Sequence, residues 1–223
     1  MHTRDLIQFL AELSENNNRA WFVMNKPRYD ILRAEFLELV TRLIKEISKF
    51  DPSVAVCNPK KALFRINRDM RFSRDKSPYK TTFSAAITAS GLKKPSQGGG
   101  PAYYFHVDAN GTLLVAGGEY MPPADRLKSI RQHIVEDPAA FGKMLKNRKL
   151  KETFGDLQDE GKLVRPPKGF DADTPHLEYI KLKSFIVWKE TSLKKKIPAD
   201  LAKELVTDFK QTYPLVAWLR QAI

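Results

Sequence analysis

A run of basic side chains at residues 60–80 is the part of this sequence best suited to chemistry. The run holds eight basic residues against two acidic ones, which gives it a net charge of +6. The whole chain of 223 residues has 38 Lys and Arg, 26 Asp and Glu, and a net charge of +12, so half of the excess lies here. A guanidinium is a planar fork of donors that suits phosphate and carboxylate groups, and lysine adds a mobile point charge. The segment therefore predicts a pocket for an anion.

Two interpretations of this segment remain open from the sequence. In the first, the protein binds a phosphate-bearing small molecule or a nucleic acid through Arg65, Arg68, Arg71, Lys76, Tyr79 and Lys80. In the second, it is a structural or protein-interaction domain whose arginines form a buried ion-pair network with Asp69 and Asp75, because buried arginines need an anionic partner. Basic residues outside the segment, at 143–151 and 181–196, are typical of a solvated surface.

The sequence leaves open whether the chain is an enzyme. A metal-dependent phosphoesterase or nuclease would use acidic or histidine side chains, and the candidates are Asp69, Asp75, His106 and Glu119. His106 also fits a purely structural role within a strand. Candidates for a supporting role are Tyr104, on the same face of the predicted strand as His106, together with Lys181 and Lys183. Neither a Gly-x-Ser-x-Gly motif nor a Cys-His nucleophile arrangement appears, and the sequence leaves any cofactor unknown.

The sequence predicts no metal site. The single cysteine, Cys57, forbids an internal disulfide and is typical of a small packing residue. His176 lies near Asp171 and Asp173, but no partner histidine stands at the spacing of a metal ligand. The Gly-rich stretch at 91–101 lacks the Lys-Ser or Lys-Thr ending of a nucleotide-binding phosphate loop, so we interpret it as a connection.

The basic segment also carries a long sequence pattern, RxxRDxRFxxxKxxY. Its named positions are filled by Arg65, Arg68, Asp69, Arg71, Phe72, Lys76 and Tyr79. On these residues the chain resembles a widespread bacterial and fungal family of unknown function, number 2461 in the series of such families. The likeness extends to the region 17–22, to Gly117-Gly118 and to 167–170. The resemblance implies that the basic segment is the hallmark of the family and favours a functional pocket there, but it implies no reaction.

Helices are predicted at both ends of the chain. Apolar residues recur at helical spacing in 6–13 and again in 29–47, with Pro27 in the first turn of the second helix and Asp51-Pro52 after it. Two antiparallel helices are therefore expected first. Further helices are expected around 127–134, across 138–150 after the cap Asp137-Pro138, and from about Pro198 to Tyr213.

Strands are predicted in the middle of the chain. Apolar residues alternate with polar ones over 82–89, and a short strand is expected before it at 62–66. The segments 103–107 and 112–119 are joined through Asn110-Gly111, which favours a hairpin turn. A last strand is expected at 178–189, with Lys181 and Lys183 on the face opposite Ile186 and Trp188.

This order of elements predicts one α+β domain over residues 1–223, with a mainly antiparallel sheet, an N-terminal helical hairpin and a C-terminal helix. A hydrophobic content of 42% is enough for one substantial core. No apolar run approaches the roughly 18 residues that a membrane span requires, and no secretory signal is recognisable. We therefore expect a cytoplasmic protein with no membrane partner; the sequence says nothing of its oligomeric state.

Overall fold

The protein is built on one curved antiparallel sheet. The computed structural model describes residues 1–69, 71, 75–90 and 100–222. The strands lie in the order β1-β2-β3-β4 and are β1 (Thr82–Thr88), β2 (Ala102–Asp108), β3 (Thr112–Glu119) and β4 (Phe185–Ser192). Every neighbouring pair of these strands is antiparallel, which confirms the predicted α+β class.

Helices precede, interrupt and follow the strands. Within the described residues they are α1 (Thr3–Glu15), α2 (Arg19–Met24), α3 (Lys26–Ile47), a 3-10 helix (Pro52–Val56), α4 (Pro59–Ala62), α5 (Ala124–Glu136), α6 (Pro138–Leu145), α7 (Arg148–Phe154), α8 (Leu177–Ile180) and α9 (Leu201–Gln221). No helix of this described part is long and apolar enough to cross a bilayer.

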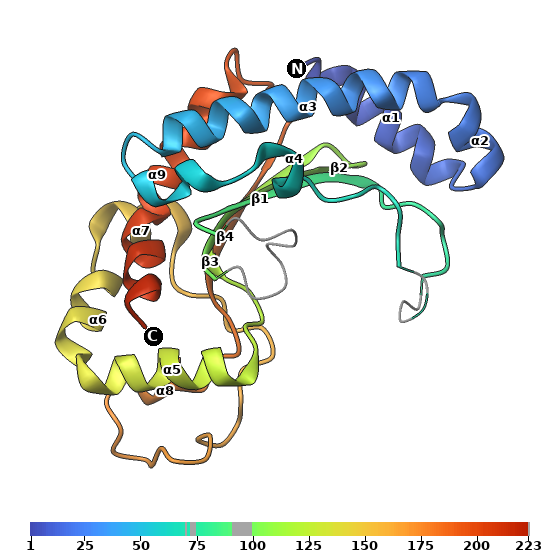
Figure 1. The fold of residues 1–223 in the computed structure, drawn as a ribbon. Coiled ribbons are helices and arrows are strands. Elements are labelled where there is room, and N and C mark those ends of the chain that lie inside the picture. Colours follow the sequence, from blue (N-terminus) through green and yellow to red (C-terminus); the bar gives the residue numbers. More distant parts are fainter. Residues whose placement is uncertain (70, 72–74, 91–99, 223) are drawn as a thin grey trace.

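The two long helices α3 and α9 cover one face of the sheet, called its outer face, and the core lies between that face and the helices (Figure 1). Phe36 of α3 packs against Phe83 and Phe105, with ring centroids 5.5 and 5.2 Å apart. Phe209 of α9 packs against Tyr103 at 5.5 Å. These strand residues alternate along β1 and β2, so the period of two seen in the sequence marks the face that the helices cover.

Two adjacent glycines let α9 and β4 approach β3. A Cβ at Gly117 would lie 2.3 Å from the Cβ of Thr212 in α9. Gly118 has φ +127°, and a Cβ there would lie 2.2 Å from the carbonyl oxygen of Phe185. A side chain at Gly117 would collide with α9 and one at Gly118 with the backbone of β4, so the packing requires glycine at both positions.

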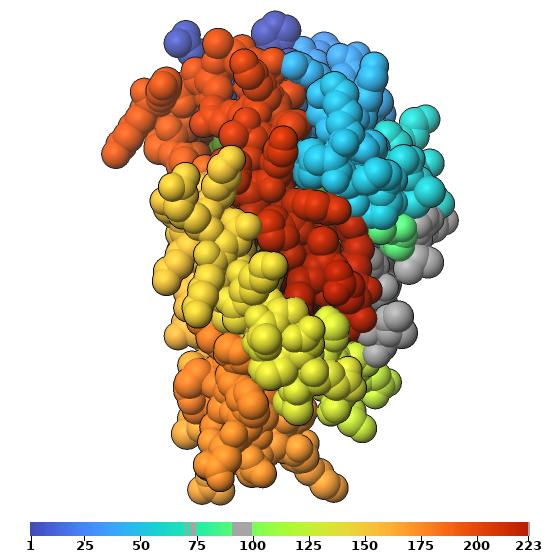
Figure 2. Space-filling model, turned by 90° about the vertical axis from the view of Figure 1, so that its left-hand side faces the viewer, coloured from blue at the N-terminus to red at the C-terminus, as the bar shows by residue number. Residues whose placement is uncertain are grey.

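Helix α9 lies on the surface between α3 and the group α5–α7, as the red segment in Figure 2. The sequence predicted that this helix ends at Tyr213, and this prediction is wrong. Pro214 removes one backbone donor inside the helix, but Leu215, Val216 and Leu219 beyond it are fully buried. Their burial outweighs the local preference of proline.

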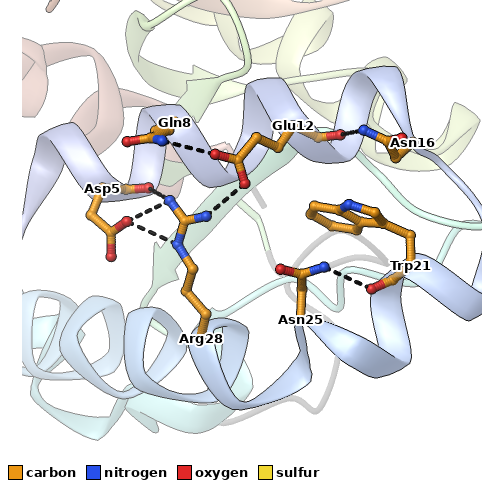
Figure 3. A network of polar contacts seen from close by, with 7 residues as sticks. All are labelled: Asp5, Gln8, Glu12, Asn16, Trp21, Asn25 and Arg28. Atoms are coloured by element: carbon orange, nitrogen blue, oxygen red, sulfur yellow. Dashed lines mark hydrogen bonds and ion pairs between the residues drawn. The ribbon is translucent and has the colours of Figure 1, made fainter.

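The predicted N-terminal helical hairpin is confirmed, with the short helix α2 inserted between its two long helices (Figure 3). Arg28 of α3 donates to Asp5 (2.9 Å, Nε to Oδ1) and to Glu12 (2.7 Å, Nη1 to Oε2), both on α1. The Arg28 guanidinium also lies 5.6 Å from the ring centroid of Phe9. These contacts fix α1 against α3 and so fix the position of the loop between α1 and α2.

Three local predictions need correction. The strand expected at 178–189 begins only at Phe185; Leu177–Ile180 is the helix α8, whose buried Ile180 satisfies the same apolar pattern. The single helix expected over 138–150 is divided into α6 and α7, because Asn147 caps a new start by accepting from Leu150 N. The strand expected at 62–66 is reduced to one bridge, Leu63 to Ala85.

Candidate anion site and the adjoining cavity

Residues 65–79, which carry the pattern RxxRDxRFxxxKxxY and are called the signature segment, are fixed to the N-terminal hairpin. The side-chain amide of Asn17 donates to the carbonyl oxygen of Tyr79 (2.9 Å) and accepts from its N–H (3.1 Å). The ring of Phe22 stacks on the ring of Tyr79 with centroids 4.0 Å apart. Tyr79 is buried, so its ring contributes packing to this site, although the sequence placed it among the binding residues.

The same segment extends the sheet beyond β1. Phe64 donates to the carbonyl oxygen of Ser84 (3.0 Å), Lys80 to that of Ile66 (2.7 Å), and Arg68 to that of Pro78 (2.9 Å), all through backbone N–H groups. Residues 64–68 and 78–84 are therefore paired with each other. This pairing sets where the basic side chains leave the backbone.

Two of the signature arginines share one carboxylate in an exposed position. Asp69 accepts from Arg71 through Nε (3.0 Å) and Nη2 (2.8 Å), and it lies 3.8 Å from Arg65 Nη2. The side chains of Arg65 and Arg71 are 69% and 78% exposed. Hydrogen bonds from Arg71 lower the pKa of Asp69, so the carboxylate is ionised. Exposed ion pairs of this kind contribute little to stability.

Arg68 is more enclosed than its neighbours. Its Nη2 lies 2.9 Å from Asp75 Oδ2 and 3.4 Å from the carbonyl oxygen of Tyr79, and its side chain is 25% exposed. Its Nε is buried without a hydrogen-bond partner. Hydrogen bonding by Ser77 lowers the pKa of Asp75, and the charge of Arg68 lowers it further. Arg68 therefore contacts the protein through Nη2, and its Nε keeps a hydrogen that no acceptor receives.

Lys80 is the half-buried cation of the segment. Burial lowers the pKa of its ammonium group, and the nearby charges of Arg65 and Arg68 lower it further. Its Nζ lies 5.4 Å from the ring centroid of Phe64, and no carboxylate among the described residues forms an ion pair with it. We call Arg65, Arg68 and Lys80 the cation cluster. Lys76 is exposed. Phe72 of the signature and Arg74, another basic residue of the segment 60–80, lie outside the described part of the chain.

A cavity of about 650 Å³ lies on the inner face of the sheet, opposite α3 and α9. Its walls and floor include Phe64, beside β1, and residues from all four strands. The strand register places Ala86, Tyr104, Ala116 and Trp188 in one row across the sheet. Ser84, His106 and Leu114 form the next row. Of these cavity residues, only Tyr104, His106 and Glu119 were site candidates from their sequence positions.

Tyr104 and His106 are joined within the cavity, as their shared strand face predicted. Tyr104 Oη lies 3.1 Å from His106 Nδ1, and Phe64 packs edge-on against Tyr104 with centroids 6.0 Å apart. Burial lowers the pKa of His106 and raises that of Tyr104. Both groups are therefore neutral near pH 7. A series of contacts connects the cation cluster to the cavity, from Lys80 through Phe64 and Tyr104 to His106.

Glu119 borders the cavity but has an ion-pair partner. Arg126 of α5 donates to both of its carboxylate oxygens at 3.0–3.1 Å. The same guanidinium donates to the carbonyl oxygens of Leu219 and Ala222 at the end of α9. Glu119 is 5% exposed, so the geometry assigns it to the anchoring of α9.

The remaining candidates lie away from the cavity and the cation cluster. Lys181 pairs with Glu178 (2.9 Å), and both Lys181 and Lys183 lie before β4, so neither residue belongs to the strand on which it was expected. His176 Nε2 lies 2.8 Å from the carbonyl oxygen of Pro138. Cys57 is buried, and burial raises the pKa of its thiol. Within the described residues, no group of three or more His, Cys, Asp or Glu side chains could hold a metal ion.

Phe64 and Trp188 are cavity residues that were not among the candidates predicted from the sequence. Their signal is present in the sequence, because Tyr104, His106 and Trp188 are large side chains at the strand positions that alternate with the core positions. Which of these side chains share one cavity depends on the strand order and register, however, and the sequence does not give these.

Comparison with known proteins identifies a family and no individual relative. No curated protein matches the chain, and no solved structure matches it. The sequence model of one family, described as "Conserved hypothetical protein (DUF2461)", matches residues 5–218, a span that contains the signature segment, the whole sheet and all but the end of α9. The chain therefore belongs to this family, as the signature at 65–79 predicted.

Proposed function

We propose that this protein binds an anionic, phosphate-bearing ligand at the cation cluster. The observation that carries the proposal is the position of Lys80, a half-buried ammonium group close to two guanidinium groups and without a carboxylate partner among the described residues. Repulsion among like charges is relieved when an anion binds between them. A phosphate group offers several acceptor oxygens to such a cluster.

Local charge supports the same proposal. The carboxylates of the segment, Asp69 and Asp75, already lie beside Arg71 and Arg68 and leave the segment with a net positive charge. The net charge of +12 on the whole chain would attract a polyanion from a distance. A nucleic acid and a small phosphate ester share this chemistry, and a test with both distinguishes them.

One observation favours the alternative that the signature is scaffolding. Arg68 contacts both Asp75 and the backbone of Tyr79, and Asn17 and Phe22 fasten Tyr79 to the N-terminal hairpin. For Arg68, a structural role and a role in binding are compatible, because its Nε has no partner. Arg65 and Lys80 are therefore the residues that separate the two interpretations.

The test is calorimetric titration with tripolyphosphate, a ring-free anion, and with a short single-stranded oligonucleotide. Lys80→Met removes the charge and keeps the apolar stem over Phe64, and it should weaken binding about tenfold or more, the scale of a charge-assisted hydrogen bond. Binding should also weaken steeply between about 50 and 200 mM salt. Tighter binding of the oligonucleotide would identify nucleic acid as the natural form of the ligand.

Arg148→Ala is the matched control. Arg148 is an exposed arginine with a carboxylate four residues away, as Arg65 is, and it lies on α7. Its loss should leave the affinity unchanged, whereas Arg65→Ala should lower it. Equal affinity of the wild type and Lys80→Met, or no binding of either anion to the wild type, would refute the proposal.

A further inference from the structure

In the cavity, one aromatic side chain lies on each side of a small residue. Tyr104 on β2 and Trp188 on β4 both pair with Ala116 of the intervening strand β3. Adjacent strands lie about 4.8 Å apart, so these two aromatic side chains start from backbones roughly 10 Å apart. Between them the floor carries only a methyl group. Ala116 is only 1% exposed, so a flat ring would lie between the two aromatic side chains and contact one on each side, with the methyl group largely covered beneath it.

The cavity is bordered by charges of both signs. Glu119, which is paired with Arg126, and Glu160 line it, and the cation cluster lies on the side of Phe64. Phe64 lines the cavity and contacts Tyr104, and the ammonium group of Lys80 lies over Phe64. Arg65 and Arg68 lie near Lys80. A ligand that fills the cavity and extends past Phe64 therefore passes from an aromatic surface to a cation cluster.

The cavity also offers a neutral polar group to the edge of a ring. His106 Nδ1 is engaged by Tyr104 Oη, while Nε2 has no hydrogen-bond partner within the described residues. A neutral imidazole has one donor and one acceptor nitrogen, so Nε2 can complement either an amino group or a carbonyl group on a heteroaromatic ring. An aliphatic chain would make no use of this nitrogen.

From this arrangement we propose that the cavity binds the base of a nucleoside phosphate, with its phosphate group on the cation cluster. This inference rests on the proposed function and specifies its ligand class. A volume of about 650 Å³ is within the range of small-molecule sites, which are mostly apolar with a few placed polar groups. Aromatic side chains bind bases by stacking with little regard to their identity, so the class of ligand is better defined than the base.

The test compares ligands that differ by the ring or by the phosphate. AMP and UMP carry both, ribose 5-phosphate lacks the base, adenosine lacks the phosphate, and tripolyphosphate reports on the cation cluster alone. At least one nucleotide should bind about tenfold or more tightly than ribose 5-phosphate, the scale of stacking on an aromatic side chain. Trp188→Ala should reduce the affinity for that nucleotide to the affinity for ribose 5-phosphate, without changing the affinity for tripolyphosphate.

Trp188→Phe is the matched variant. It keeps an aromatic wall, so nucleotide affinity should stay within a few-fold of the wild type. The chain has three tryptophans, and quenching of their fluorescence by a bound base should be lost in this variant because Trp188 is the one in the cavity. The two variants thus test the site even if Trp188→Ala is destabilised.

Failure of the inference differs from failure of the proposed function. If nucleotides and ribose 5-phosphate bind equally and both are lost in Lys80→Met, the anion site stands and the base pocket is refuted. If adenosine binds as well as AMP and Lys80→Met changes neither, the pocket takes an uncharged ring and both proposals are wrong about phosphate. Binding of the oligonucleotide without binding of any mononucleotide also overturns the inference.

Discussion

The ion pairs that anchor α9 and those of the signature segment differ in how far they are removed from water. Asp51 is 2% exposed and accepts from Arg220 of α9 (2.7 Å) and from Tyr103 (2.7 Å). In the signature segment, Asp69 is 40% exposed and its partner Arg71 is 78% exposed. Buried pairs are costly to break, and exposed pairs contribute little.

A second buried pair serves the same helix. Glu119 and Arg126 meet next to the carbonyl groups of Leu219 and Ala222, so both buried pairs hold the C-terminal turns of α9. The charged residues that fix the fold are thus found outside the charge-rich motif. This difference favours a binding role for the signature arginines, with Arg68 in an intermediate position.

The largest effect is expected from Asp51→Ala. The change leaves Arg220 largely buried without its carboxylate and removes the acceptor of the Tyr103 hydroxyl. The free energy of unfolding should fall by about 3–5 kcal/mol, as when one partner of a buried pair is removed. For a chain of this length the melting temperature should fall by roughly 10 °C in a thermal denaturation experiment.

A double variant and acidification sharpen this test. Asp51→Ala combined with Arg220→Met should lose less stability than the sum of the single changes, because neither charge is then left alone.

Burial by itself would raise the pKa of Asp51, but hydrogen bonds from Arg220, Ser53 and Tyr103 hold it below its usual value. Its contribution is therefore present above about pH 4 and lost as the pH falls through the lower, folded-state pKa. If Asp51→Ala alone is as stable as the wild type, the buried pair of Asp51 and Arg220 does not stabilise the fold as described.

An intermediate effect is expected from Arg68→Met. The change removes the pair with Asp75 and the contact with Tyr79, while Asn17 still clamps Tyr79. Because Asp75 is 53% exposed, the melting temperature should fall by only a few degrees, about 2–4 °C. Hydrogen exchange of the backbone N–H groups of Arg68 and Lys80 should accelerate. A loss as large as that of Asp51→Ala would instead favour the scaffold interpretation.

The comparison also shows what the sequence could predict. Period-two alternation and Asn110-Gly111 predicted β1 and the hairpin of β2 and β3, because these signals are local. Residues 51 and 220 are 169 positions apart, and no local pattern connects them. The strand expected at 178–189 was wrong in its first part, 178–184, for a related reason: buried apolar residues two apart fit either a strand or a short helix until their neighbours are known.

The candidate site divides in the same way. The signature identified the basic side chains because their type and spacing are visible in the sequence. It could not show that Tyr79 is buried against Phe22, or that Glu119 is held by Arg126, because both facts depend on contacts between distant elements. The cavity depends on the register of four strands, which placed Trp188 in one row with Tyr104.

The smallest effect on stability, and the most informative one on binding, is expected from Asp69→Ala. Its carboxylate lies in an exposed pair, so the melting temperature should change by less than roughly 2 °C. If the segment binds anions, Asp69 competes with the ligand for Arg65 and Arg71, and its removal should increase the affinity for tripolyphosphate a few-fold. Glu152→Ala removes the analogous partner of Arg148 and should change neither quantity. If affinity decreases in Asp69→Ala while stability is kept, Asp69 orients the arginines for the ligand; if stability falls by several degrees, the exposed pair belongs to the scaffold after all, and the contrast with Asp51 disappears.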